Sequence, residues 1–381
     1  MEITNKIPFN KPYLTGKEAH YIYNAVYKGH ISGNGDYTKK CQQFFTDKYK
    51  FKKNLLTTSC TDALEMAALL TGIQPGDEVI VPSYTFVSSA LAFVRQGAVI
   101  KFIDSSALHP GMNEDDLEKM ITPKTKAIVV VHYAGVACDM DKIMAVASAH
   151  NLFVIEDAAQ AIDSYYNNKP LGGIGHFGCF YFHETKNIQC GEGGLLAVND
   201  ERFVERAEII WEKGTNRSKF FRGEIDKYGW VDTGSSFLPS DMLAAFLLAQ
   251  LEHIELIQKR RQQIWSQYHR LLKPLADEVL IKLPFIPVYA TNNMHMFYVI
   301  CKDIADRSAL IKHLKSVGIL SVFHYISLHN SEFIKSTNQP YTTLPYAEAY
   351  SDTLLRLPFF YELSDENVEL ICKEIYKFYK A

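Results

Sequence analysis

Short β-rich runs alternate with helical patterns between about residues 53 and 157, and this alternation restricts the chain to a few folds. Strands separated by helices are typically parallel, because the chain must cross back over the sheet before it begins the next strand. The pattern therefore predicts an α/β fold with a mainly parallel central sheet flanked by helices. The expected strands are 55–58, 78–82, 99–103, 127–131, 153–157, 179–182 and 194–198, and the expected helices include 63–70, 88–95 and 140–150.

The pattern becomes strongly helical from residue 240 to about 271, a stretch too long for a simple crossover between two strands. We interpret it as a bridge between two lobes. We expect a large domain over residues 1–250 and a small α+β domain over residues 251–381. The expected elements of the small domain are a strand at 296–300 and helices around 308–317 and at 364–379.

The composition excludes several classes of partner. With 40 Lys and Arg against 43 Asp and Glu, the formal net charge is −3, so no overall basic field would attract nucleic acid or an anionic membrane. The first residues lack an apolar core of signal-peptide length, and no apolar stretch is long enough to cross a bilayer. We therefore expect a cytoplasmic protein whose partner is a small molecule or another protein chain.

The cysteines and histidines do not indicate a metal site. The seven cysteines are scattered without a Cys-x-x-Cys pair, and the 13 histidines lack a His-Glu-x-x-His arrangement. We expect neither a bound metal nor a disulfide framework.

Residues that directly follow the expected strands are the first candidates for chemistry, because ligands of an open parallel sheet bind beyond the carboxyl ends of its strands. Ser59, Cys60 and Thr61 lie between the first strand and a helix. The free N–H groups and the positive dipole end of that helix would hold a phosphate group. The alternative is an ordinary helix N-cap at Ser59 or Thr61.

A carboxylate and a lysine follow, and with the helix start they are the groups that pyridoxal 5′-phosphate needs. Asp157 ends an apolar strand, where a carboxylate can hold the protonated ring nitrogen of this cofactor; Glu156, on the opposite face, is the competing carboxylate. Gln160 could reach the ring hydroxyl or lie at the surface. Lys186 precedes the glycine-rich run 191–194, which permits close backbone approach to a ligand. Such a lysine can form a Schiff base and carry a proton, although by itself it could be a surface residue.

One motif match points to a different cofactor. The run 173–178 matches the dinucleotide-binding pattern G-x-G-x-x-G, but it follows a turn-like segment and leads into a strand. A dinucleotide fingerprint requires a strand before it and a helix after it. We therefore assign the run to a loop and reject a nicotinamide enzyme.

Several runs carry a resemblance to a known family. They are 178–187 around the lysine, 192–194, 212–217, 234–236, and 322–325 with Leu328 and His329. With these runs the chain resembles the DegT/DnrJ/EryC1/StrS sugar-nucleotide aminotransferases over essentially its whole length. The resemblance implies the type I fold of PLP-dependent transferases, which is the fold of aspartate aminotransferase. It also implies a homodimer with shared active sites.

The resemblance assigns a role to each matching position. Lys186 corresponds to the Schiff-base lysine, Asp157 to the partner of the ring nitrogen and Gln160 to a contact of the ring hydroxyl. The backbone N–H groups of Cys60 and Thr61 would hold the phosphate. The remaining positions are Phe86, which would stack on the cofactor ring, and Ser32, Asn34, Tyr325 and His329, which would lie near the sugar substrate.

Two positions depart from the family pattern. Relatives often have a phosphate-binding serine five residues before the lysine, where this chain has Tyr181, whose phenol could donate a hydrogen bond. Many relatives also carry a Gly-Tyr-Asn-Tyr-Arg segment supplied by the partner subunit, whereas here Ser236 takes the asparagine position and no arginine remains. The basic loop nearby leads us to expect that Arg217 or Arg222 contacts the nucleotide diphosphate.

The most similar members of the family imply a specific reaction. It is the transfer of an amino group from L-glutamate to C4 of dTDP-4-dehydro-6-deoxy-D-glucose. The product would be dTDP-4-amino-4,6-dideoxy-D-galactose, for a bacterial surface polysaccharide such as enterobacterial common antigen or the O-antigen of lipopolysaccharide. The competing outcomes are the glucose-configured 4-epimer, or amination at C3.

Two different classes of function compete with this reaction. Related 3-dehydratases are disfavoured, because they have histidine where this chain has Lys186. A non-catalytic sensor or regulatory role is the second, since a fold does not determine a function.

Overall fold

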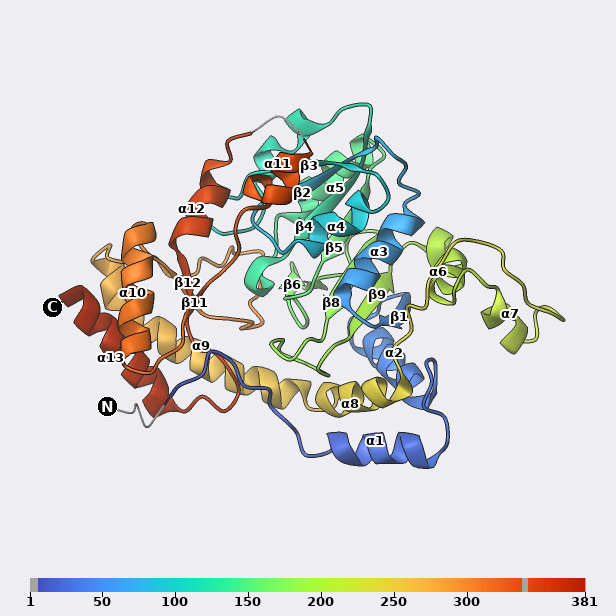
Figure 1. Cartoon of the computed structure of the whole chain (residues 1–381), viewed down its shortest axis with the longest axis horizontal. Coiled ribbons are helices and arrows are strands. Elements are labelled where there is room, and N and C mark those ends of the chain that lie inside the picture. The colour runs from blue at the N-terminus through green and yellow to red at the C-terminus, as the bar shows by residue number, and fades with distance from the viewer. Residues whose placement is uncertain (1–5, 338–341, 381) are drawn as a thin grey trace.

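The centre of the molecule is a seven-stranded sheet with the strand order β1-β9-β8-β5-β4-β2-β3 (Figure 1). The computed structural model describes residues 6–337 and 342–380. All seven expected strands form, which confirms the α/β prediction, although β1, β4 and β8 begin slightly earlier than expected and β1 and β8 also end earlier. The strands are β1 (Lys53–Thr57), β2 (Glu78–Pro82), β3 (Val99–Ile103), β4 (Thr125–Val131), β5 (Phe153–Asp157), β8 (Phe177–Tyr181) and β9 (Gly194–Val198).

One strand of this sheet breaks the parallel arrangement. β9 pairs antiparallel with both of its neighbours, β1 and β8, whereas β8, β5, β4, β2 and β3 are mutually parallel. The physical reason is the connection, because the loop 182–193 between β8 and β9 contains no helix that would carry the chain back across the sheet. This loop holds Lys186 at the edge where the parallel strands end.

Helices cover both faces of the sheet, because successive residues of each strand point to opposite sides. In β1, for example, Leu56 packs with one buried cluster and Leu55 with the other. The first cluster includes residues of α2, α5 and α8, and the second includes residues of α3, α4 and α6. The helices of this lobe are α1 (Glu18–Tyr27), α2 (Asp36–Tyr49), α3 (Cys60–Leu70), α4 (Ser88–Val94), α5 (Met140–Ala149), α6 (Val204–Trp211), α7 (Arg217–Phe221) and α8 (Asp241–Leu251).

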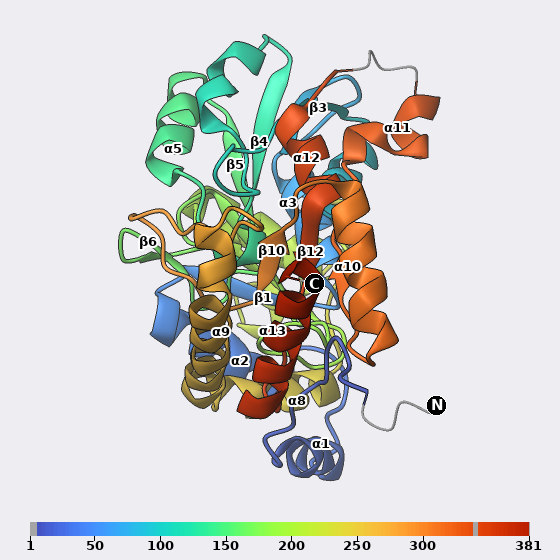
Figure 2. The same cartoon turned by 90° about the vertical axis from the view of Figure 1, so that its left-hand side faces the viewer.

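A second lobe is built on a three-stranded antiparallel sheet with the order β10-β12-β11. Its helices pack beside this sheet, with α9, α10 and α13 close together (Figure 2). The elements of this lobe are α9 (Ile254–Asp277), β10 (Tyr298–Ile300), α10 (Ile304–Ser316), β11 (Val322–Phe323), α11 (Glu332–Ser336), α12 (Pro345–Thr353), β12 (Leu354–Arg356) and α13 (Asp365–Lys380). A small hairpin, formed by β6 (Tyr165–Tyr166) and β7 (Lys169–Pro170), belongs to the first lobe.

The long helix α9 connects the two lobes. Ile254 and Ile257 in its first turns belong to a core cluster of the first lobe, whereas Ile264 and Tyr268 belong to the core of the second. Ile7, from the start of the chain, also packs into this second core. The domain boundary at residue 250 stays a prediction. No helix in the two described ranges combines the length and the apolarity that crossing a membrane requires.

Candidate active site

A cavity of about 290 Å³ lies where the parallel strands end, between the first turn of α3, the loop 182–193 and the second lobe. β4 and β5 each end at it, with Val131 and Asp157 in its wall. It therefore occupies the place where ligands of an open α/β sheet bind. The predicted residues that it brings together are Cys60, Thr61, Phe86, Asp157, Gln160, Tyr181, Lys186 and Tyr325.

The first turn of α3 forms one wall of the cavity. Ser59 is the N-cap, and its Oγ accepts a hydrogen bond from the N–H of Asp62 at 3.1 Å. The N–H groups of Cys60 and Thr61 have no partner inside the helix, because the first N–H groups of a helix never do. Gly194 allows β9 to start directly beside this turn, since a Cβ there would collide with the backbone of Ser59 and Cys60. The arrangement suits a phosphate group.

Asp157 ends β5 with its carboxylate buried beside the cavity. Its Oδ2 accepts a hydrogen bond from the hydroxyl of Ser89 at 2.6 Å, and its Oδ1 accepts one from the N–H of Ala159 at 3.2 Å. Burial raises the pKa of Asp157, while these two donors and Lys186 act in the opposite direction. Two donors and a nearby lysine therefore favour a charged carboxylate in a buried position.

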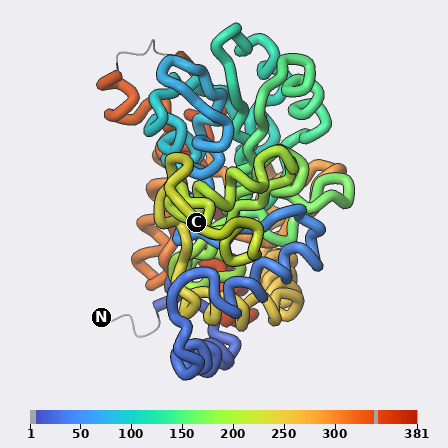
Figure 3. Tube along the Cα trace, turned by 90° about the vertical axis from the view of Figure 1, so that its right-hand side faces the viewer, coloured from blue at the N-terminus to red at the C-terminus, as the bar shows by residue number. Residues whose placement is uncertain are grey.

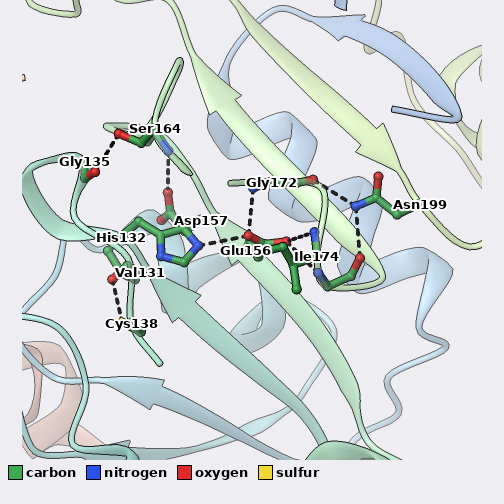
Figure 4. A network of polar contacts seen from close by, with 12 residues as sticks. Val131, His132, Gly135, Cys138, Glu156, Asp157, Ser164, Gly172, Ile174 and Asn199 are labelled. Carbon is green, nitrogen blue, oxygen red and sulfur yellow. Dashed lines mark hydrogen bonds and ion pairs between the residues drawn. The ribbon is translucent and has the colours of Figure 1, made fainter. Parts of the chain in front are cut away.

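Glu156 is not among the residues that line the cavity and has a different role; Figure 4 shows the polar contacts around it. Its carboxylate accepts hydrogen bonds from the N–H groups of Gly172, Ile174 and Gly175 at 2.7, 2.7 and 2.6 Å, and Nε2 of His132 lies 3.0 Å from it. The loop that matches G-x-G-x-x-G is thus folded around a carboxylate of the protein itself. Its last glycine, Gly178, already lies in β8, as the rejection of a dinucleotide site requires.

Lys186 lies in the loop between β8 and β9 and reaches the same cavity. Its Nζ lies 5.3 Å from the centroid of the Tyr181 ring. Burial lowers the pKa of Lys186 to about 8, and Arg356 contributes to the decrease, whereas Cys60 and Asp157 oppose it. A lysine with this pKa is partly neutral at physiological pH, which is the form that attacks an aldehyde.

Gln160 joins the large lobe to the loop that carries Tyr325. Its Oε1 accepts a hydrogen bond from the N–H of Ala134 at 2.6 Å, and its Nε2 donates one to the Tyr325 hydroxyl at 3.2 Å. Phe86 is 55% exposed and its ring centroid lies 6.1 Å from that of Tyr325. An exposed aromatic ring beside the cavity is suited to stacking on a ligand.

Tyr181 occupies the position where relatives often have serine. Its ring faces Lys186, and its hydroxyl donates a hydrogen bond to Oε2 of Glu192 at 2.8 Å. A contact between this hydroxyl and a phosphate would require it to leave Glu192, so the phosphate role of Tyr181 stays a prediction.

The remaining predicted residues, apart from His329, lie together in a second cavity of about 730 Å³, between the amino-terminal segment and the loop 212–236. The chain segments that line this cavity, blue for the amino-terminal segment and yellow for the loop 212–236, face the viewer in Figure 3. Two of its arginines already have acidic partners. Arg217 lies 3.5 Å from Glu212, and Arg222 pairs with Glu208 at 2.9 Å and Glu224 at 2.6 Å. The predicted residues in this cavity are Ser32, Asn34, Arg217, Arg222 and Ser236.

His329 is among the lining residues of neither cavity. It is buried, with Nδ1 2.6 Å from the hydroxyl of Ser83 and Nε2 3.0 Å from Glu348. The structure therefore gives it a place in the packing between the lobes, and it does not bring it to Lys186.

Three ionisable residues that the second lobe brings to the first cavity were not predicted from the sequence. Arg356 lies in β12, and His295 and His324 come from loops of the second lobe. Burial lowers the pKa of both histidines well below the ordinary value, which keeps them neutral. A charged residue inside the apolar run 354–358 is the signal that could have indicated Arg356.

The first cavity contains every group that pyridoxal phosphate requires. It offers a lysine amine, a carboxylate for the ring nitrogen and a helix amino terminus for the phosphate. When bound, this cofactor withdraws electrons from the substrate carbon attached to it. The residues present fit the cofactor that the sequence predicted.

Comparisons with known proteins agree with this geometry. The model of the DegT/DnrJ/EryC1/StrS aminotransferase family matches residues 12–376. A GDP-perosamine synthase from Escherichia coli O157:H7 is 33% identical over 374 residues, which cover 98% of each protein.

Two solved structures are similar over almost their whole length. The PLP form of Spr1654 from Streptococcus pneumoniae, described as a putative sugar aminotransferase, has a TM-score of 0.90 at 26% identity, with 99% of each chain covered. DesV of S. venezuelae has a TM-score of 0.90 at 28% identity, with 99% of this chain and 100% of that chain covered. These similarities confirm the predicted type I fold and the predicted cofactor.

Proposed function

Because the chain belongs to the DegT/DnrJ/EryC1/StrS family and is a PLP-dependent sugar aminotransferase, we propose that it aminates C4 of dTDP-4-dehydro-6-deoxy-D-glucose with L-glutamate as the donor. The proposed product is dTDP-4-amino-4,6-dideoxy-D-galactose, made in the cytoplasm for a surface polysaccharide. The observation that carries the chemistry is that Lys186 and Asp157 share one cavity. The choice of sugar is supported by the runs around Lys186 and at 212–217 and 322–325.

The residues of the first cavity have distinct tasks in this proposal. The N–H groups of Cys60 and Thr61 bind the phosphate of the cofactor, and Asp157 keeps the proton on the ring nitrogen. Gln160 is oriented by the N–H of Ala134, so that its amide faces the ring hydroxyl. Lys186 would hold the cofactor aldehyde through its Nζ and, once displaced by the amino donor, would carry the proton that leaves the donor α-carbon, for which a pKa near the working pH is best.

The second cavity supports a homodimer in which each subunit completes the site of its partner. Ser236 occupies the position of a residue that relatives supply across the subunit interface, and it lies apart from Lys186 of its own chain. Arg217 is the better candidate for the nucleotide diphosphate, because its Nε is buried without a hydrogen-bond partner among the residues that the structure describes. Arg222 is engaged by two carboxylates, which a diphosphate would have to displace.

A GDP-linked sugar is the second candidate substrate. It is favoured by the similarity to the GDP-perosamine synthase, whose name indicates a GDP sugar. The glucose-configured 4-epimer and a sugar aminated at C3 are the products that compete with the proposed one.

The test is turnover of two nucleotide sugars under the same conditions. The holoenzyme is incubated with glutamate and either dTDP-4-dehydro-6-deoxy-D-glucose or the corresponding GDP-mannose-derived 4-keto sugar. NMR of the product identifies the aminated carbon and its configuration. Amination of only the GDP sugar, or an equatorial amino group at C4 of the dTDP sugar, would contradict the proposal.

A further inference from the structure

Arg356 is a partly buried arginine whose charge is not matched by an acid among the described residues. Its Nε is buried without a hydrogen-bond partner, and no carboxylate among the described residues forms an ion pair with it. The groups that act on its charge are the hydroxyls of Tyr84, Tyr133 and Tyr325. Partial burial of an arginine beside neutral groups carries a desolvation free energy, and only a partner of opposite charge offsets it.

Two more deeply buried arginines of the second lobe, Arg261 and Arg307, donate hydrogen bonds to backbone carbonyls. Arg261 donates hydrogen bonds to the carbonyls of Met294 and His295 at 2.9 and 2.6 Å, and Arg307 donates one to the carbonyl of Ser351 at 2.8 Å. For Arg356 no such donated bond is found within residues 6–337 and 342–380. Its guanidinium instead lies 4.8 Å from the ring centroid of Phe9, which covers it from one side.

The position of Arg356 explains what this charge can meet. It lies at the end of β12, the central strand of the small sheet, between the partners Tyr298 and Val322, and its side chain lines the cavity of Lys186. Its charge reaches Lys186 itself, whose pKa it helps to lower. The cavity therefore presents a cation from the second lobe, opposite the helix end and carboxylate of the first.

The anions of the proposed reaction can be assigned to different parts of the molecule. The phosphate of the cofactor has the amino terminus of α3, and the nucleotide diphosphate has the second cavity with Arg217. The amino donor carries a carboxylate that must lie next to the carbon that Lys186 deprotonates. In the part of the chain that the structure describes, no second arginine lines this cavity.

We propose that Arg356 binds a carboxylate group of the amino donor through its planar guanidinium and so holds the donor over Lys186. This inference rests on the proposed use of glutamate. Two parallel N–H···O bonds are the geometry in which an arginine binds a carboxylate best. Phe9 and the surrounding tyrosines exclude water from one side, which strengthens such a pair.

The experiment is the donor half-reaction without any sugar, so its outcome does not depend on which sugar is used. Arg356→Gln and Arg356→Lys holoenzymes are mixed with increasing glutamate, and the spectral change of the cofactor is followed. We expect the glutamate concentration for half-maximal rate to rise about 30-fold or more in R356Q. The increase should be smaller in R356K, because lysine keeps the positive charge but lacks the two parallel N–H donors of the guanidinium. The dissociation constant of glutarate, a dicarboxylate without an amine, should rise in parallel in calorimetry.

Two readouts and one control variant separate this role from a structural one. The dissociation constant of PLP and the Michaelis constant for the nucleotide sugar should stay within about twofold of wild type in both variants, because neither anion is bound by Arg356 in the proposal. Arg270→Gln, at an exposed position of α9, is the matched control. Unchanged glutamate and glutarate affinities in R356Q would overturn the inference, and so would a selective loss of PLP affinity. A wild-type enzyme that reacts with glutamate but not with the sugar would contradict only the proposed function.

Discussion

The hydroxyl of Ser89 donates a hydrogen bond to Oδ2 of Asp157 at 2.6 Å, although 68 residues separate them in the chain. Ser89 lies in the first turn of α4 and Asp157 at the end of β5, so two connections of the parallel sheet are needed to bring them together. Burial raises the pKa of Asp157, and the hydrogen bond from Ser89 acts in the opposite direction.

Replacing Ser89 by alanine should therefore weaken cofactor binding. Without this donor the pKa of Asp157 rises further, and less of its charged form is left to hold the ring nitrogen. We expect the dissociation constant of PLP to increase roughly tenfold in Ser89→Ala, the effect of about 1.4 kcal/mol from one charge-assisted hydrogen bond. Fluorescence titration of the apoenzyme measures it. Ser148→Ala, at an exposed position of α5, is the control, and an unchanged constant in S89A would speak against the role of this bond.

Attachment of PLP to the apoenzyme should follow the ionisation of Lys186. The attacking form is the neutral amine, and a pKa of about 8 instead of 10.5 makes roughly a quarter of it neutral at pH 7.5. We expect the second-order rate of attachment to rise with pH and level off above a midpoint near 8. Stopped-flow absorbance between pH 6 and 10 measures the profile. A midpoint near 10 would show that burial does not lower the pKa, and Lys186→Ala should show no attachment at all.

Glu156 should contribute to stability and not directly to catalysis. In Glu156→Gln the amide can no longer accept from Gly172, Ile174, Gly175 and His132 together, because its NH2 group meets an N–H donor. We expect a loss of about 2–3 kcal/mol and a decrease in Tm of roughly 3 °C, measured by differential scanning fluorimetry. Glu184→Gln, at an exposed position, should leave Tm unchanged. A variant E156Q of normal Tm that fails to bind PLP would contradict this division of roles.

Mixed dimers should show that Arg217 acts in the partner's site. Lys186→Ala and Arg217→Ala are each expected to be nearly inactive as homodimers. If Arg217 reaches the neighbouring site, a heterodimer of the two variants contains one complete site, and co-expressed mixtures should recover about one quarter of the wild-type activity. Activity of tagged and purified heterodimers is the measurement. A heterodimer without activity would place Arg217 in the site of its own subunit.

The sequence predicted the elements that local patterns control. The strand end at Asp157 and a helix that begins near Thr61 follow from the two periodicities and from the turn residues between them, and α3 starts one residue earlier, at Cys60. Asp157 was preferred to Glu156 as the carboxylate beside the cofactor. In the structure Asp157 lines the cavity, and three backbone N–H groups bind Glu156 elsewhere. The antiparallel direction of β9 was not expected, because the sequence pattern of a strand does not indicate in which direction the strand pairs with its neighbours.

The positions of Lys186, Asp157 and the first turn of α3 were thus determined by the sequence itself, since each is defined by neighbours a few residues away. The contact of Ser89 with Asp157, the arrival of Arg356 at the cavity and the separation of Ser236 from Lys186 were decided only by the tertiary structure. The physical reason is that these relationships depend on how distant strands are ordered in two sheets and how the lobes close on each other. The order of the strands is determined by the packing of whole sheet and helix faces, and it cannot be inferred from any single segment of the sequence.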